Sequence, residues 1–414
     1  MKFRNLILML LLLSGIGVCL ADNQPTDSLV VISGTIKEKA HKKKLADVSL
    51  SVPGSNIATI TNTDGFFSIK VPRKRIKEGI RAEHIGYKTT IINPQNLIGK
   101  EDYVVWMEPS VMMLDEVTVY GAEPRSLIES AINKIPQNYS ANHNLFSAFY
   151  RETIQKGRRY IGVSEAIVNV SKKPYRIRHI KGDRVQIVKG RRLMSQKSSD
   201  TIAVKIVGGP ALPVVLDVVK NPNILLNLSE LDYYDFKMEP MALIDDRQQF
   251  VVSFRPKVKV DYALHIGKVY IDRETQSFTR AEFSLDVSDK EKATKAILYK
   301  KPRGLHFKPQ EIEFVVTYKF QDGISYLNYI RTKTRFKCDW KRRLFSSGYA
   351  AYAEMVMVDR EENPLSSISR KDAFDTKEIF YDMVDNFSDA DFWNDYNIIE
   401  PTESLEKAVL KLRK

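Results

Sequence analysis

The chain has 414 residues, of which 43% are hydrophobic, 28% charged and 10% aromatic, and its formal net charge is +13. This length provides for two or three domains with a core each, and the composition excludes a disordered, collagen-like or disulfide-rich protein. Beyond Ala21 no apolar stretch reaches the length of a membrane span, which excludes a polytopic membrane protein.

Residues 1–21 have the pattern of a secretory signal peptide. Two basic residues precede an apolar run over 6–13, and Cys19 and Ala21 place small side chains near the expected cleavage point. This order of features is typical of export signals, so we predict cleavage after Ala21 and an exported protein. Two alternatives remain open: an uncleaved membrane anchor, and a lipid attached to Cys19.

Cleavage would leave a single cysteine, Cys338. One thiol cannot form an intrachain disulfide, so the stability of the exported chain must come from packing. Cys338 stands in an alternating apolar segment beside Trp340. This position favours a buried core side chain over a nucleophile.

The excess of positive charge is spread over clusters at expected turns and strand ends, at 42–44, 73–75, 191–192 and 341–343. Such clusters are usually solvated faces or protect edge strands. An exported chain rarely meets nucleic acid, so we predict no nucleic-acid partner. Attraction to anionic envelope lipid or polysaccharide remains an alternative.

Residues 28–109 predict a β-sandwich of seven strands. Within 47–52 apolar residues alternate with serines, which buries one face of the strand. Asp64-Gly65 is typical of a tight turn. The strand candidates are rich in β-branched and aromatic residues and lie at 29–37, 47–52, 57–62, 66–71, 80–85, 88–92 and 103–107. Short strands in such number without a helix favour a sandwich.

Two runs in this region, LADVSLSVPGSNIATITNTDGFFSIKVP at 45–72 and HIGYKTTII at 84–92, closely resemble the carboxypeptidase-like regulatory domain. That family is a prealbumin-like β-sandwich at the N-termini of many outer-membrane proteins of Gram-negative bacteria. The resemblance covers about a fifth of the chain. It implies an accessory module without catalytic residues, and a place in the periplasm or at the outer membrane.

Residues 110–122 are expected to form a tether. The run LDEVTVYG at 114–121 is similar to the segment that joins this same sandwich to the plug and barrel of starch-utilisation-type TonB-dependent transporters. Too few residues follow here for such a barrel. The transport function that the tether would imply is therefore not predicted.

Residues 123–370 predict a larger, curved antiparallel β domain with a few helices. The run 126–129 has the pattern of a capping box, and Pro136 is expected to end the helix that begins there. Long alternating segments follow, and Asp322-Gly323 is a strong hairpin signal between two of them. Successive hairpins favour a meandering sheet that resembles half of a barrel.

Two segments of this domain, GKVYIDRET at 267–275 and TRAEFSLDV at 279–287, are similar to hairpins of lipoprotein-carrier-like half-barrels. In those proteins a curved sheet wraps an apolar groove that helices cover. The resemblance implies a groove for a lipid-like ligand in the second domain.

Residues 208–228 (GGPALPVVLDVVKNPNILLNL) are apolar except for Asp217 and Lys220, and Gly, Pro and Asn divide them into short helices. Three interpretations are open: the stretch fills the concave face of the sheet as core, it is a movable lid over an apolar groove, or it contacts a membrane. The groove or lid residues would be Val214, Val215, Val218, Val219, Leu225 and Leu226.

Residues 371–414 form a C-terminal segment that is expected to end in a helix over 402–413. Acidic residues lie near the start of this helix and basic residues near its end, as the helix dipole favours. Its apolar residues recur at helical spacing, so we expect it to dock on the rest of the chain.

The sequence contains no recognisable catalytic constellation. None of its 6 histidines stands at a zinc-ligand spacing, and we find no nucleophile elbow, phosphate-binding loop or dinucleotide fingerprint. We therefore predict no catalytic residue, no metal ligand and no cofactor. A pair of carboxylates from distant positions could still make a glycosidase, which sequence alone does not exclude.

These features predict a non-catalytic protein of the periplasm or outer membrane with an accessory or binding role. Its partner would be an outer-membrane or periplasmic protein or a lipid-like ligand, and the chain would have no transmembrane span after signal cleavage. The alternative is a periplasmic hydrolase that acts on peptide or glycan.

Overall fold

The computed structural model describes residues 28–100, 103–110, 123–197, 200, 204–340, 346–375, 378–386, 393 and 396–412. The predicted signal peptide at 1–21 and residues 111–122 of the predicted tether lie outside the described residues. No helix in the described part of the chain is long and apolar enough to cross a membrane.

The N-terminal unit is a sandwich of two small sheets, as expected. Its described strands are β1 (Leu29–Glu38), β2 (Ser49–Ser51), β3 (Ala58–Ile60), β4 (Phe66–Pro72), β5 (Ile80–Glu83), β6 (Thr90–Ile92) and β7 (Val104–Met107). One sheet has the order β4-β1-β7 and the other β3-β2-β5-β6. All strands are antiparallel to their neighbours except β7, which runs parallel to β1.

The sandwich buries the alternating apolar residues that the sequence pattern indicates. Ile32 and Ile36 of β1 and Phe67 and Ile69 of β4 have no exposed surface. The turn before β4 requires glycine, because Gly65 has a φ of +72° and a Cβ there would lie 2.7 Å from the Ile36 carbonyl oxygen. Two short 3₁₀ helices, η1 (Arg73–Glu78) and η2 (Pro94–Asn96), were not expected.

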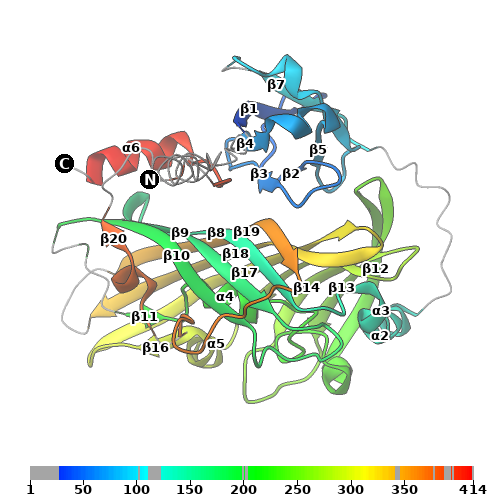
Figure 1. Ribbon diagram of the computed structural model, residues 1–414. Helices are drawn as coiled ribbons and strands as arrows, with labels where there is room; N and C mark the ends of the chain where they lie inside the picture. Colours follow the sequence, from blue (N-terminus) through cyan, green and yellow to red (C-terminus); the bar gives the residue numbers. More distant parts are fainter. Residues whose placement is uncertain are drawn as a thin grey trace, which may run out of the picture.

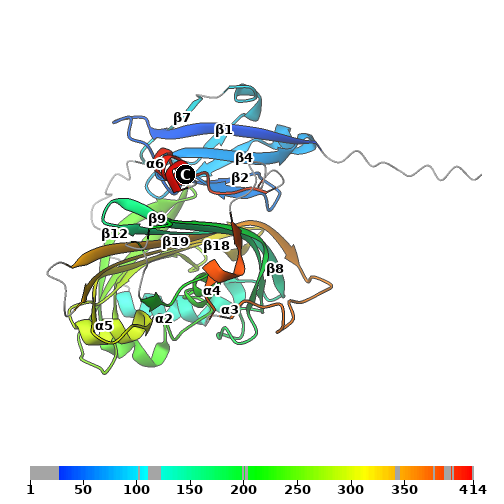
Figure 2. The same ribbon diagram turned by 90° about the vertical axis from the view of Figure 1, so that its left-hand side faces the viewer.

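The second unit is a large, curved, open sheet (Figures 1 and 2). In the described residues its strands follow the order β12-β13-β14-β15-β17-β18-β19-β8-β9-β10-β20. They are β8 (Asn144–Lys156), β9 (Arg159–Lys172), β10 (Arg184–Met194), β12 (Tyr234–Ile244), β13 (Arg247–Pro256), β14 (His265–Asp272), β15 (Phe278–Leu285), β17 (Leu305–Gln321), β18 (Ile324–Trp340), β19 (Ser347–Glu362) and β20 (Asp385–Asn386). Every pairing is antiparallel except that of the short β20 with β10.

The hairpin expected at Asp322-Gly323 joins β17 to β18. Asp322 has a φ of 53° and Gly323 a φ of 82°, and Gln321 pairs with Ile324 across the turn. Positive φ at both central residues is the geometry of a type I′ turn, whose twist matches that of the flanking strands. The turn aligns the residues next to it, and the register of the two strands shifts farther along, between Thr317 and Tyr318 and between Pro309 and Glu311.

Helices cover the concave side of this sheet (Figure 2). They are α2 (Pro124–Asn133), α3 (Ile135–Asn138), α4 (Ala211–Val215) and α5 (Lys290–Ile297), with the 3₁₀ turns η4 (Leu228–Tyr233) and η5 (Phe380–Met383). The short strands β11 (Lys205–Ile206) and β16 (Leu298–Lys300) pair with each other beside them. The capping box predicted at 126–129 is wrong, because Pro124 opens α2 earlier and Glu123 is the N-cap residue, without a side-chain cap.

The sandwich lies against the convex side of the sheet, and the C-terminal helix α6 (Glu403–Leu412) lies beside it (Figure 1). This interface has its own apolar core, in which Phe149, Tyr329 and Val356 of the sheet meet Ile60 of the sandwich and Ile399 of the C-terminal segment. The expected helix over 402–413 is therefore present, and it docks within the chain.

Candidate functional site

The six residues predicted to line a groove or lid lie on the concave side, and most belong to its core. Val214, Val218, Val219, Leu225 and Leu226 are buried, and Val215 is half-buried. A cavity beside Leu225 and Leu226 holds about 20 Å³. That volume has room for a single water molecule. Whether the stretch moves as a lid stays a prediction.

The stretch 208–228 is held to the sheet by its two charged residues. Asp217 has no exposed surface, and its Oδ2 lies 2.8 Å from Nζ of Lys172. The hydroxyls of Tyr175 and Tyr318 donate to the same carboxylate at 2.8 and 2.7 Å. Burial opposes both charges, but their pairing keeps the pKa of Lys172 above and that of Asp217 below its usual value.

Lys220, the second charge of the stretch, makes a different set of contacts. Its ammonium is buried and donates to the backbone carbonyls of Lys173, Pro174 and Ile177. Burial lowers the pKa of Lys220 to about 8. Moving the stretch away from the sheet would break this set and the Asp217 pairs together.

A much larger opening lies on the other side of the sheet. We call it the convex cleft: a space of about 880 Å³ between the convex face of the sheet, the 61–63 loop of the sandwich and the start of α6. This volume is in the range of small-molecule binding sites. Its charged lining is balanced and consists of Arg151, Lys268, Arg331, Lys333 and Arg335 against Asp47, Glu282, Glu313, Glu354 and Glu400.

Strand register places many of these charges in one line across the sheet. Neighbouring members of this line, which we call the charge row, are directly opposite one another on adjacent strands from β14 to β10. In the order of the strands, the members of the charge row are Lys268, Glu282, Val315, Arg331, Glu354, Arg151, Glu165 and Arg191. Apart from Val315, basic and acidic residues alternate, so each charge has an opposite charge beside it.

Arg151 is the centre of the charge row. Its Nε donates to Oε1 of Glu165 at 2.7 Å and its Nη2 donates to the carbonyl of Ile399 at 2.7 Å, while Nη1 lies 3.4 Å from Glu354. Arg151 is 4% and Glu165 2% exposed. Burial would raise the pKa of Glu165, but Arg151 and Arg191 hold it below its usual value.

Two carboxylates of the cleft have the opposite shift. Burial raises the pKa of Glu354 and that of Glu400, and in both cases nearby Arg151 opposes the shift without cancelling it. Glu354 also accepts a hydrogen bond from the Tyr329 hydroxyl at 3.3 Å. Carboxyl groups with raised pKa values in a cleft are candidates for proton transfer.

Two rows flank the charge row on the convex face. On one side Tyr329, Val356, Phe149 and Ile167 form an apolar row, which the sandwich and the C-terminal segment cover. On the other side lies a row that faces the cleft, which we call the open row. Its members pair across six strands and are Ile266, Ser284, Glu313, Lys333, Tyr352 and Thr153.

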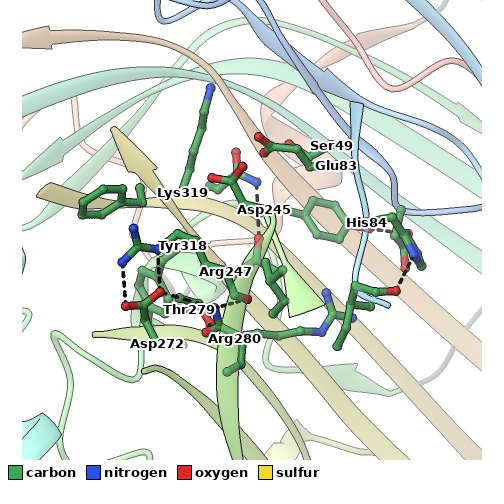
Figure 3. Close-up of a pocket in the computed structure, with 18 of the residues that line it drawn as sticks. Ser49, Glu83, His84, Asp245, Arg247, Asp272, Thr279, Arg280, Tyr318 and Lys319 are labelled. Carbon is green, nitrogen blue, oxygen red and sulfur yellow. Dashed lines mark hydrogen bonds and ion pairs between the residues drawn. The ribbon is translucent and has the colours of Figure 1, made fainter. Parts of the chain in front are cut away.

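A smaller cavity of about 80 Å³ lies under the sandwich, beside the convex cleft (Figure 3). Asp47 lines both spaces and is paired with Arg331. Below it Arg247 is paired with Asp272 at 2.6 Å, and Thr279 donates to Gln249 at 2.7 Å. Several of its charged groups are paired and its volume holds only a few water molecules, so we interpret it as part of the domain interface.

His84 lies at the edge of this cavity, in the turn after β5 (Figure 3). Its Nδ1 is 3.0 Å from the carbonyl oxygen of Ile85, and burial lowers the pKa of its ring. No group of three or more His, Cys, Asp or Glu side chains in the described residues is arranged to hold a metal ion.

Sequence reasoning did not identify the convex cleft. The alternation that builds it is visible in Glu311 and Glu313 and in Arg331, Lys333 and Arg335, which put like charges on one face of each strand. Only the pairing of β17 with β18 brings the glutamates of one strand against the basic residues of the other. Nζ of Lys333 then lies 2.9 Å from Oε1 of Glu311 and 3.0 Å from Oε2 of Glu313.

Comparison with known families identifies the sandwich. Residues 32–119 match the family model of the CarboxypepD_reg-like domain. The resemblance expected from the sequence is therefore confirmed for the N-terminal unit, which defines a protein with a carboxypeptidase-regulatory-like sandwich on a curved β-sheet. No curated protein matches the chain significantly.

Solved structures with partial likeness include a DUF1329 family protein from Desulfovibrio piger ATCC 29098, which is 12% identical with a TM-score of 0.26 and aligns over 59% of this chain and 96% of that one. MucB in complex with MucA(peri) is 9% identical, with a TM-score of 0.19 over 58% of this chain and 100% of that one. Lipovitellin, solved for its lipid–protein interactions, is 7% identical, with a TM-score of 0.25 over 55% of this chain and 26% of that one.

Proposed function

We propose that this protein is a non-catalytic binding protein of the cell envelope and that the convex cleft is its binding site. One observation supports this most: the cleft of about 880 Å³ is walled by three parts of the chain that are far apart in sequence, the 61–63 loop, the sheet and α6. Sites between packed units are where ligands are most often bound. Export through residues 1–21 is part of the proposal.

The pairing of charges supports binding over catalysis. Arg151, Arg331 and Lys333 are each held in ion pairs with carboxylates of the chain. A catalytic base or nucleophile needs a lone pair directed at the substrate, whereas the lone pairs of the partner carboxylates Glu165, Asp47 and Glu311 are directed at these cations. Such a network keeps its shape when a ligand arrives, which lowers the entropic cost of binding.

Crosslinking in intact cells of the native host tests the proposal. A photoreactive phenylalanine analogue replaces Tyr352 in the cleft, or Tyr299 as the control, which is 56% exposed on β16 and does not line the cleft. We expect position 352 to form adducts and position 299 to form none. The adducts should be found in the periplasmic or outer-membrane fraction. A cytoplasmic protein, or equal labelling at both positions, would refute the proposal.

A second candidate function, hydrolysis of peptide or glycan, is supported by the raised pKa values of Glu354 and Glu400 in the same cleft. A carboxylic acid that keeps its proton can protonate a leaving group while a second carboxylate acts as base or nucleophile. Purified mature protein would then cleave members of a peptide or glycan library. Glu354→Gln or Glu400→Gln would abolish that turnover, and a chain without turnover excludes this candidate.

A further inference from the structure

Every member of the open row lines the convex cleft. The open row crosses β14, β15, β17, β18, β19 and β8 in unbroken register, and the covered apolar row lies on the far side of the charge row. Adjacent strands are about 4.8 Å apart, so six strands give a floor of roughly 24 Å. A floor of this length suits a chain of several units better than a single small molecule.

The balance of charge argues against ionic and apolar ligands. The cleft has as many basic as acidic side chains, and several of them form ion pairs with one another, such as Lys333–Glu313 at 3.0 Å and Arg331–Asp47. Steering of a charged ligand needs an excess of one sign. An apolar chain would strip water from these ion pairs without replacing its hydrogen bonds, which is costly.

The position of the floor argues against an extended peptide. Peptides that bind sheets through their backbone add to an exposed edge strand. The open row runs across central strands of the sheet, where the backbone groups of β17, β18 and β19 are already paired on both sides. A ligand on this floor can therefore be recognised only by side chains.

The side chains of the floor match a ligand rich in hydroxyls. A hydroxyl donates one hydrogen bond and accepts two, so it can accept from an ammonium such as that of Lys333 while donating to a carboxylate such as that of Glu313. Charge-assisted hydrogen bonds of this kind are strong. The half-buried rings of Tyr352 and Tyr160, which line the same cleft, offer flat apolar surfaces with a polar end.

From these observations we infer that the convex cleft binds an uncharged oligosaccharide, which lies along the open row with a sugar ring against Tyr352. This inference rests on the proposed function, because it names the ligand of the same cleft. Sugar hydroxyls supply donors and acceptors for the paired charges. The faces of the sugar rings, where C–H groups are exposed, pack on the tyrosine.

Calorimetric titration of the intact mature chain tests this inference. The probes are neutral hexasaccharides of glucose, xylose, mannose and N-acetylglucosamine, with a hexamer of galacturonic acid and a pool of unstructured hexapeptides for comparison. We expect saturable binding of at least one neutral hexasaccharide. We expect Tyr352→Ala to weaken that binding about tenfold, the size of a lost aromatic contact, and Lys333→Met to weaken it as well.

Tyr299→Ala is the matched control, because this ring is exposed outside the cleft and its loss should leave the affinity unchanged. Neutral binding that survives both Tyr352→Ala and Lys333→Met would overturn the inference. A third outcome is that galacturonate or peptide binds, no neutral hexasaccharide binds, and Tyr352→Ala abolishes the binding. This outcome would overturn the inferred ligand class, but the convex cleft would still be a binding site. The absence of any ligand together with no crosslink at position 352 would refute the proposed function itself.

Discussion

The ammonium of Lys172 on β9 lies 2.8 Å from Oδ2 of Asp217, and neither side chain has exposed surface. The pair joins the apolar stretch 208–228 to the concave face of the sheet, and Asp183 approaches the same ammonium at 3.1 Å. A buried charge is tolerated only with such partners, and removal of one partner leaves the other uncompensated. Substitution of one partner of this pair therefore tests how strongly the pair holds the stretch to the sheet.

We expect Asp217→Ala to lower the free energy of unfolding by about 3–5 kcal/mol, because Lys172 loses its nearest carboxylate in the interior. Denaturation in urea, followed by far-UV circular dichroism, measures this change. Asp232→Ala is the control, since its side chain is 72% exposed in a pair with Arg125, and its effect should stay within about 1 kcal/mol. Equal effects of the two substitutions would contradict the structural role of Asp217.

Arg151 connects the sheet to the C-terminal segment through the carbonyl of Ile399. We expect Arg151→Met to destabilise the chain by about 3–5 kcal/mol, because Glu165 would keep its buried charge with one partner fewer. Hydrogen exchange over 396–412 should become faster as this segment loses its anchor. Arg335→Met, at a side chain that is 54% exposed, should leave exchange unchanged, and a similar profile for both variants would refute the anchoring.

Glu152 on β8 should make stability depend on pH. Burial raises the pKa of its carboxyl from 4.5 to about 7, and the Tyr150 hydroxyl donates to it at 2.9 Å. The native state keeps the proton up to about pH 7, whereas the unfolded state releases it near 4.5. The native state therefore binds more protons between these values, and the free energy of unfolding falls as the pH rises through this window.

Urea denaturation at about pH 5 and about pH 8 measures this effect. We expect the free energy of unfolding of the wild-type chain to be lower at about pH 8 than at about pH 5 by an amount on the order of 1–3 kcal/mol. Glu152→Gln should abolish this difference. Glu274→Gln, at a side chain that is 78% exposed, should keep the wild-type dependence. If the free energy of unfolding depends on pH in the same way in wild type and in Glu152→Gln, other groups cause the effect.

Cys338 is 8% exposed, and burial raises the pKa of its thiol to about 11. The thiolate is the reactive form, so native mature protein should react with a disulfide reagent roughly a hundredfold more slowly than the chain unfolded in urea. Absorbance of the released thiolate follows the reaction. Equal rates in the native and unfolded chain would show an accessible, activated cysteine, contrary to the position expected from its sequence.

Local patterns predicted much of the secondary structure. The strand expected at 66–71 is β4 (Phe66–Pro72), and the turn at Asp322-Gly323 is where the sequence indicates it. Both depend on neighbouring residues only: alternation for the strand, positive φ for the turn. The start of α2 was misplaced because a proline at the first turn competes with the capping pattern two residues later.

The candidate site could not be predicted in the same way. Arg151 and Glu354 are 203 positions apart and meet only because β8 pairs with β19. Each strand shows its own alternation of charged residues, but a shift of one residue in register would turn those charges to the other face. Nothing local in the sequence specifies which distant strands become neighbours.

The sequence by itself determined the kind of most segments, namely the sandwich strands, the long strands of the sheet and the C-terminal helix, and it showed no familiar catalytic motif. These follow from side-chain periodicity and backbone preference, which act over a few residues. Only the tertiary structure decided that Asp217 and Lys220 hold the apolar stretch in place, and that opposite charges line up beneath the sandwich. Both depend on contacts between residues far apart in the chain, where burial and pairing set the energy of each charge.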